Sequence, residues 1–238
     1  EVVRDSREPV RAIDIARRVG LSSAAANNIV RTLYIRGYLN QEENGRYILG
    51  GQSYLLGSGA DAWNELRSLA CEPMSDLSRK NNNLSFLGVA SRGQIVAVEI
   101  VEGQGPVVIP KNQEWLDQFH CTAVGKVLLA AMSESDYSDF KKQYRLRKLT
   151  EKTITNWSTL EKQLDEIRRS GYSVCHDESV FGVTSIAVPV RSSDGKIIAS
   201  LATVFSSYYL NDIYQQEMVL QLQDVAIRIS EAGKGNAK

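Results

Sequence analysis

The sequence predicts an α+β protein with a small N-terminal domain (residues 1–57), a connecting helix (58–71) and a larger C-terminal domain (72–238). Three observations lead to this prediction. Two short amphipathic helices and an Asn-Gly hairpin signal fall within the first 57 residues. Four β-rich runs, joined in pairs by short turns, alternate with helical segments further on. With 238 residues, of which 43% are apolar and 24% charged, the chain is long enough to bury two cores.

The first two helices are separated by a tight turn. The first lies within residues 10–20 and ends at Gly20, which suits a left-handed cap. Ser22 and Ser23 can cap the second, which runs over residues 24–36. The apolar residues at helical spacing are Ile13, Ala16 and Val19 in the first helix and Ala26, Ile29, Val30 and Leu33 in the second.

A hairpin is predicted directly after the second helix. The short apolar runs 38–40 and 46–50 flank the polar turn 41–45, whose Asn-Gly pair is typical of tight hairpins. Two helices followed by a hairpin form a winged helix-turn-helix, whose second helix enters the major groove of DNA. Some domains of this kind bind protein instead, but the order and spacing of the elements favour DNA.

Eight residues are candidates for contacting double-stranded DNA. On the second helix, amide and guanidinium groups that face away from the apolar stripe can bond to base edges, and Asn27 and Asn28 are the candidates for base readout. Arg11, Asn44 and Arg46 are placed to contact phosphates or the minor groove. The complete set is Arg11, Ser22, Ser23, Asn27, Asn28, Arg31, Asn44 and Arg46.

The charge of the chain gives the DNA interpretation modest support. Basic and acidic residues balance at 28 each, whereas the first 57 residues hold eight Arg, no Lys and six acidic residues, a local excess of +2. Arginine offers a planar fork for phosphates and guanine edges. An excess of this size also fits an ordinary solvated surface.

The two domains are expected to be joined by a helix that is interrupted. After residues 50–59, which are rich in Gly, Ser, Tyr and Leu, apolar residues recur at helical spacing as far as Asn81. Proline is tolerated in the first turn of a helix but disrupts its interior. We therefore expect a new helix to begin at Pro73, with the domain boundary between Glu72 and Pro73.

Composition favours a protein of the reducing cytoplasm. Three cysteines without framework spacing argue against a secreted disulfide scaffold. No apolar run reaches the length of a membrane span, and no signal-peptide pattern opens the sequence. Residues 1–4 read as the last turn of a helix already under way, so we expect the N-terminus to be incomplete.

The C-terminal domain is predicted to be a mainly antiparallel sheet with helices on its faces, because hairpins alternate with helices. The β-rich runs are 84–90 and 95–101, joined by 91–94, and 185–190 and 197–205, joined through 193–195. The helices are 122–132, 158–170 and 211–230. The last helix carries one apolar stripe, formed by Met218, Leu222, Val225 and Ile229.

Three stretches of the chain together carry a resemblance to a known family. The first is Arg36-Gly37-Tyr38 with residues 45–50, and the second is residues 120–130, which follow the pattern His-x-[Ser/Thr]-x-x-Gly-Lys-x-x-Leu-Ala. The third comprises residues 171–174, 182–190 and 194–195. With these stretches the chain resembles, along nearly its whole length, the isocitrate lyase regulator (IclR) family of bacterial transcription factors.

The resemblance implies a GAF-like effector domain, dimers that pair into tetramers, operators with some palindromic symmetry, and no catalysis. It also implies an effector pocket between the sheet and the segment around Ala123 and Val124, where backbone amides at a helix N-terminus suit an organic carboxylate. The effector-binding residues so implied are His120, Ala123, Val124, Cys175, Ser185, Ala202 and Val204.

Two departures from the family pattern affect what is expected. Members that sense small keto acids tend to carry an Asp, a Cys and two Ser where this chain has Cys175, Ser185, Ala202 and Val204. We therefore expect a catabolic intermediate with an apolar or aromatic portion rather than glyoxylate or pyruvate. On the second helix, residues 23–25 are Ser-Ala-Ala where Lys-Ser-Thr is usual, so some phosphate contacts are expected to be missing.

Two His–Cys pairs leave other chemistry open. His120-Cys121 and Cys175-His176 together offer four zinc-compatible ligands, but neighbours on an extended segment point to opposite sides and the spacing matches no standard zinc pattern. A thiolate beside a histidine could serve acyl chemistry, but nothing orients the base. We expect no metal, cofactor or catalysis. A thiol- or metal-dependent enzyme fused to a winged helix is the alternative, and a protein-binding adaptor a third. Asp177-Glu178 is expected to be a solvated loop.

Overall fold

The computed structural model describes residues 2–6, 8–53, 63–107 and 117–235. It divides into two compact units, Glu1–Ala62 (unit 1) and Trp63–Lys238 (unit 2). The connecting helix expected over 58–71 lies partly outside the described residues, and its described part belongs to α4 (Asn64–Asn81).

Helix α4 runs without interruption through Pro73, so the break predicted there is wrong. A proline inside a helix removes one backbone hydrogen bond and costs about 3 kcal/mol. In α4 this cost is offset by packing, because Pro73 is buried together with Ala70, Met74 and Leu77 against the sheet.

Unit 1 consists of two helices and a hairpin. Helices α1 (Ala12–Val19) and α2 (Ser23–Ile35) precede strands β1 (Leu39–Gln41) and β2 (Tyr47–Leu49), and Leu39 is paired with Leu49. The order of elements is the predicted one.

The core of unit 1 is smaller than the sequence suggested. Its buried apolar residues are Val10, Ala16, Ala26, Val30 and Leu39. Four residues of the predicted stripes are between 37 and 54% exposed, namely Ile13, Val19, Ile29 and Leu33. The two short helices meet through small alanines, and Val19, Ile29 and Leu33 line an apolar groove together with Val2 and Val3.

Unit 2 is a five-stranded antiparallel sheet with the order β4-β3-β7-β6-β5. The strands are β3 (Leu84–Ser91), β4 (Gln94–Val101), β5 (Ser173–His176), β6 (Val183–Arg191) and β7 (Ile197–Ser206). Both predicted hairpins, β3–β4 and β6–β7, are confirmed, and β7 pairs with β3 to join them. Strand β5, which has only four residues, was not predicted as a strand.

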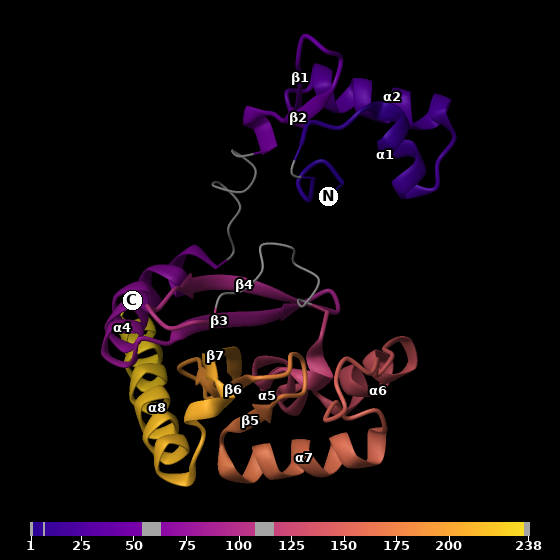
Figure 1. The fold of residues 1–238 in the computed structure, drawn as a ribbon. Coiled ribbons are helices and arrows are strands. Elements are labelled where there is room, and N and C mark those ends of the chain that lie inside the picture. The colour runs from indigo at the N-terminus through magenta and orange to yellow at the C-terminus, as the bar shows by residue number, and fades with distance from the viewer. Residues whose placement is uncertain (1, 7, 54–62, 108–116, 236–238) are drawn as a thin grey trace. The chain divides into compact units, whose positions relative to one another are not determined.

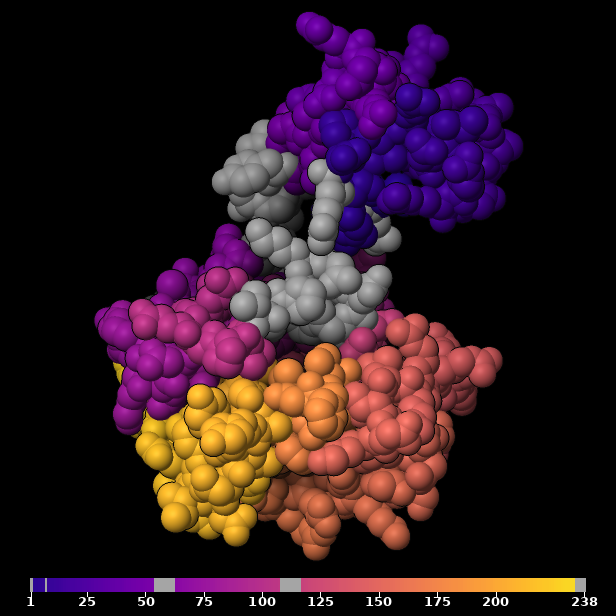
Figure 2. All heavy atoms as spheres, viewed as in Figure 1, coloured from indigo at the N-terminus to yellow at the C-terminus, as the bar shows by residue number. Residues whose placement is uncertain are grey.

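Helices cover both faces of this sheet (Figure 1). On one face lie α4 and α8 (Asp212–Gly235); the predicted stripe of α8 is confirmed, since Met218, Leu222, Val225 and Ile229 are all buried. On the other face lie α5 (Ala123–Ala131) and α7 (Trp157–Ser170). The outer side of α8, yellow in Figure 2, is part of the surface of unit 2.

The remaining elements connect these layers. The short 3-10 helices η2 (Phe119–Cys121) and η3 (Ser207–Tyr209) precede α5 and α8, and α6 (Glu134–Gln143) follows α5. Helix α6 was not predicted, because none of its residues is fully buried and its apolar face consists of Tyr137 and Phe140 alone. None of the described helices is both long and apolar enough to cross a membrane.

Candidate functional site

The turn between α1 and α2 has the local geometry that its residues favour. Gly20 ends α1 in the left-handed conformation, with φ 67°, and its N–H donates to the carbonyl of Ala16. The hydroxyl of Ser22 accepts from the N–H of Ala25 at 3.3 Å and so caps α2. The hydroxyl oxygen of Ser22, a candidate DNA contact, is therefore already engaged as a hydrogen-bond acceptor within the turn.

The outer face of α2 is polar and open to solvent. Ser23, Asn27, Asn28 and Arg31 are all exposed, and Ala26 and Val30 are buried on the opposite face. No hydrogen bond within the described part of the chain engages the side-chain amides of the two asparagines. Exposed amide and guanidinium groups on one helix face are suited to bidentate contacts with base edges. Arg11, the N-cap residue of α1, is exposed as well.

The two candidate DNA contacts of the hairpin, Asn44 and Arg46, both make hydrogen bonds within unit 1. The side-chain oxygen of Asn44 accepts from the N–H of Arg46 at 2.9 Å, and its amide donates to Glu42 at 3.2 Å. The half-buried guanidinium of Arg46 donates to the carbonyl of Pro9 at 3.4 Å. Both candidates thus shape the turn and its attachment to unit 1.

In unit 2, four of the implied effector residues share one face of the sheet. Cys175, Ser185 and Val204 are neighbours in register across β5, β6 and β7. Ala202 lies two residues before Val204 and therefore on the same face, beneath α5. Ser185 offers the only hydroxyl of the four, so this face is largely apolar.

The N-terminus of α5 lies over this face. The N–H of Ala123 donates to the hydroxyl of Ser185 at 3.4 Å, and Thr122 caps the helix by accepting from the N–H of Gly125 at 3.2 Å. The N–H of Val124 has no acceptor among the described residues. A helix end with such an amide favours negative charge.

Close packing on η2 fixes the position of α5. A Cβ on Gly125 would lie 2.4 Å from the Cα and the carbonyl oxygen of Phe119, so only glycine allows this approach. Ala123 and Val124, the implied effector residues on α5, are consequently held at a fixed distance from the sheet.

His120 is turned toward other partners. Its Nε2 donates to the carbonyl of Arg147 at 2.9 Å, and its Nδ1 lies 2.8 Å from the hydroxyl of Tyr144. Because a carbonyl only accepts, Nε2 carries the proton in the neutral ring. Burial lowers the pKa of His120, which favours that neutral form. Both ring nitrogens are thus engaged within unit 2.

A buried ion pair joins α5 to the loop after β5, and the sequence had not indicated it. The ammonium of Lys126, whose side chain is 0% exposed, donates to both carboxylate oxygens of Glu178 at 2.6 and 2.8 Å and to Gln163 at 2.7 Å. Burial alone would lower the pKa of Lys126, but the negative charge of the Glu178 carboxylate beside it favours the ammonium form, and the pKa is raised. One signal was present: Lys126 is the single charged residue of α5.

The loop expected to be solvated is therefore buried at its start. Asp177 and Glu178 are only 5 and 7% exposed. Asp177 has a φ of 59° and accepts from the hydroxyl of Ser207 at 2.5 Å and from the N–H of Gly182 at 2.9 Å. The Ser207 hydrogen bond holds the pKa of Asp177 below its usual range. The expectation of a solvated loop was wrong because two adjacent acidic residues usually lie exposed to solvent. Here both carboxylates have partners, which the sequence alone does not reveal.

The two cysteines of unit 2's core are poor nucleophiles. Burial raises the pKa of Cys121 to about 12 and also raises that of Cys175. His176 bonds instead to Thr184, at 3.0 Å, and lies 3.5 Å from Asp177. Within the described ranges, no group of three or more His, Cys, Asp or Glu side chains could hold a metal ion.

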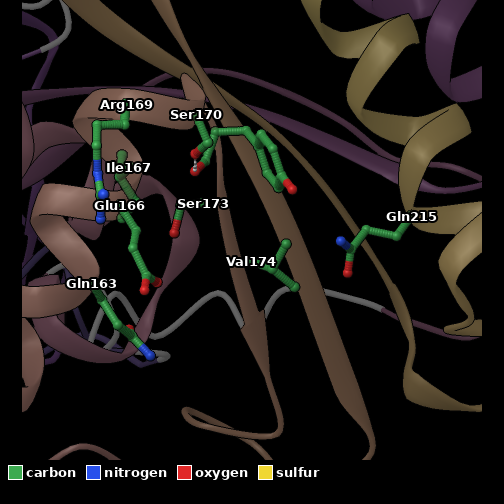
Figure 3. A pocket seen from close by; sticks show the side chains of 9 residues that line it. Gln163, Glu166, Ile167, Arg169, Ser170, Ser173, Val174 and Gln215 are labelled. Atoms are coloured by element: carbon green, nitrogen blue, oxygen red, sulfur yellow. Dashed lines mark hydrogen bonds between the residues drawn. The ribbon is translucent and has the colours of Figure 1, made fainter.

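One groove of unit 2 lies away from the implied effector residues. About 560 Å³ in volume, it follows the open edge of β5, and no effector candidate lines it. Figure 3 shows Gln163, Glu166 and Arg169 of α7 on one side and Gln215 of α8 on the other. Val204 lines a smaller groove of about 240 Å³ at the end of β7.

Comparisons with known proteins show which family the chain belongs to. The family model "Bacterial transcriptional regulator IclR C-terminal" matches residues 62–231. The chain is 26% identical over 233 residues to the HTH-type transcriptional regulator XynR of Escherichia coli. This alignment covers 98% of the chain and 92% of XynR. It is 32% identical over 179 residues to the glycerol operon regulatory protein of Streptomyces griseus, with coverage of 75 and 70%.

The fold is also that of solved structures. An IclR homolog from Microbacterium hydrocarbonoxydans, complexed with 4-hydroxybenzoate, superimposes with a TM-score of 0.83. The match covers 97% of this chain and 94% of that one, at 22% identity.

Proposed function

The chain belongs to the IclR family of bacterial transcriptional regulators. We propose a separate role for each of its two units in effector-modulated DNA binding. Unit 1 acts as a winged helix-turn-helix that binds double-stranded operator DNA, and unit 2 as a GAF-like domain that binds a small molecule. The observation that carries this division is the exposed polar face of α2, opposite buried Ala26 and Val30.

Binding to DNA adjacent to the gene tests the first half. Fluorescence anisotropy of labelled DNA should give an affinity that falls linearly with the logarithm of the salt concentration, because bound phosphates release counterions. A flat salt response, or no binding, would refute the proposal.

Two substitutions test the assignment of α2. Asn28→Ala and Arg31→Ala should each weaken specific binding by about 5- to 150-fold, which corresponds to about 1–3 kcal/mol for a lost bidentate base contact. Arg79→Ala, which removes an exposed arginine of unit 2, is the matched control and should leave binding unchanged. If Asn28→Ala and Arg31→Ala bind as tightly as the control, α2 does not read the bases.

For the effector we propose an organic acid with an apolar or aromatic portion. The amide of Val124 and the hydroxyl of Ser185 suit a carboxylate. Cys175, Ala202 and Val204 offer apolar surface and a neutral thiol. An aromatic acid, 4-hydroxybenzoate, occupies the structure of similar fold.

Ligand-induced thermal stabilisation tests this assignment. 4-Hydroxybenzoate should raise Tm more than pyruvate or glyoxylate does, because a ligand that binds only the native state stabilises it. Ser185→Trp should abolish the shift by filling the site, whereas Ser193→Trp, in the exposed β6–β7 turn, should retain it. Stabilisation by pyruvate or glyoxylate alone would show that the effector class is wrong.

We propose no enzymatic role, metal or cofactor. The thiolate that an acyl-transferring enzyme needs is disfavoured, because burial raises the pKa of both Cys121 and Cys175. The proposed partners are operator DNA, the effector and further copies of the chain, as dimers that pair into tetramers. The protein would act in the cytoplasm, where the chromosome lies, without a membrane partner.

A further inference from the structure

An uncharged aromatic patch stands out at one end of the sheet of unit 2. Phe181 is 83% exposed and Tyr208 is 89% exposed, with Val180, Tyr209 and Ile213 at 57, 52 and 79%. We name these five residues the aromatic patch. Most large apolar side chains of unit 2 are buried on the two faces of the sheet, so this exposure has no explanation in the fold.

The two segments that carry the patch are tied to each other. The N–H of Ser207 donates to the carbonyl of Gly182 at 2.8 Å, which places Phe181 and Tyr208 on either side of a backbone contact. Asp177 reinforces this contact by accepting from both Gly182 and Ser207. The rings of Tyr208 and Tyr209 meet edge to face, with centroids 5.4 Å apart.

The loop of the patch is also anchored in the core. Glu178, two residues before Val180, is held by the buried ammonium of Lys126. A surface whose backbone is held at both ends loses little conformational freedom on binding, which favours association.

We propose that the aromatic patch is a surface for self-association, occupied by the same patch of a second copy of this chain. Within residues 179–182 and 206–213 the single charged side chain is that of Asp212, next to Ile213. Two copies can therefore meet across a two-fold axis through the uncharged part around Phe181 and Tyr208 without opposing like charges there. Phenylalanine and tyrosine are enriched at the centres of interfaces, where they supply much of the binding energy.

The area agrees with a dimer contact. A fully exposed aromatic side chain offers roughly 200 Å², so the three rings and the two aliphatic side chains together offer about 600 Å² per copy. Two copies would bury about 1,200 Å², the lower limit for a specific protein interface.

Analytical ultracentrifugation of the full chain tests the proposal. Because no DNA is present, a negative result would count against the self-association surface and not against the DNA-binding assignment. Phe181→Glu would oppose two carboxylates near the axis and remove an anchor. It should raise the dissociation constant of the assembly about 30-fold or more, the equivalent of losing one interface hot spot.

Leu220→Glu is the matched control. Leu220 is 67% exposed on the outer side of α8, where Ile213 and Ile227 precede and follow it by seven residues. If the aromatic patch is the interface, Leu220→Glu associates like the wild type. Dissociation by Leu220→Glu but not by Phe181→Glu would assign the contact to α8 and overturn the proposal, as would a wild type that is monomeric throughout.

Hydrogen exchange at low and high protein concentration locates the contact independently. Backbone amides of residues 179–182 and 207–211 should become protected as the concentration rises. Concentration-dependent protection confined to other segments would overturn the proposal, even if the mass of the assembly had changed.

Discussion

Removing the ammonium of Lys126 should destabilise unit 2 severely. Lys126→Met keeps the volume and the apolar stem of the side chain but leaves Glu178, whose side chain is 8% exposed, without a cation. Breaking one side of a buried pair costs about 3–5 kcal/mol, because the remaining charge stays buried and unpaired. For a domain of this size each kcal/mol lowers Tm by roughly 2–4 °C, so Tm should fall by about 6–20 °C.

The pH dependence of this variant distinguishes a lost charge from lost packing. Without Lys126, the buried carboxylate of the variant has no cation, and taking up a proton relieves the cost of the unpaired charge in the folded state. The folded state then binds more protons than the unfolded state, so the free energy of unfolding falls as pH rises from 5 to 8. Wild-type protein, in which Glu178 is paired, should lack this fall.

Urea unfolding followed by tryptophan fluorescence measures both effects. Lys162→Met, which removes an exposed lysine of α7, is the control and should cost less than about 0.5 kcal/mol at either pH. The double substitution Lys126→Met with Glu178→Met should recover much of the loss, because an apolar pair can replace a buried ion pair. The reasoning fails if Lys126→Met is as stable as Lys162→Met, or if its loss of stability does not grow with pH.

Three further predictions follow from the packing and titration of unit 2. Gly125→Ala should prevent α5 from packing on Phe119 and lower the free energy of unfolding by more than about 3 kcal/mol. Gly233→Ala is the control: its Cβ would lie 3.6 Å from the nearest atom, so it should be neutral or stabilising. Thermal unfolding of the two variants compares these effects. Because the pKa of His120 is lowered, the unfolded state alone takes up a proton below about pH 6.5, so stability should fall as pH drops, and His120→Asn should flatten that fall. In native protein a thiol reagent at pH 8 should modify one cysteine, exposed Cys71, and all three in urea; rapid reaction of a second thiol in native protein would contradict its burial.

Patterns with a clear period were sufficient for most of the fold. The β6–β7 hairpin was visible because Asp-Gly separates two β-rich runs, and the buried stripe of α8 was visible because its residues repeat at helical spacing. Only Tyr137 and Phe140 of helix α6 pack on the core, and β5 alternates over no more than four residues, so neither pattern is long enough to be distinctive. The rule that proline interrupts a helix failed at Pro73, because packing against the sheet stabilises α4 there. Such packing cannot be detected from the neighbouring residues alone.

The site was less accessible to sequence reasoning. The exposure of Asn27 and Asn28 follows from their position opposite a buried stripe, so it could be expected. The Lys126–Glu178 pair joins residues 52 positions apart, and its existence depends on how α5 is placed on the sheet. The implied role of His120 came from resemblance alone, and its actual partners, Tyr144 and Arg147, depend on a turn that has no sequence signature.

The central position of β7 has an evolutionary consequence. Its backbone is bonded to β3 on one side and to β6 on the other, so its path depends little on the side chains it carries. Ala202 and Val204 can therefore be exchanged for other small residues while the sheet stays in place. If Ala202 and Val204 contact the effector as proposed, a lineage can acquire a new ligand preference through one or two point mutations and keep its existing mode of DNA recognition.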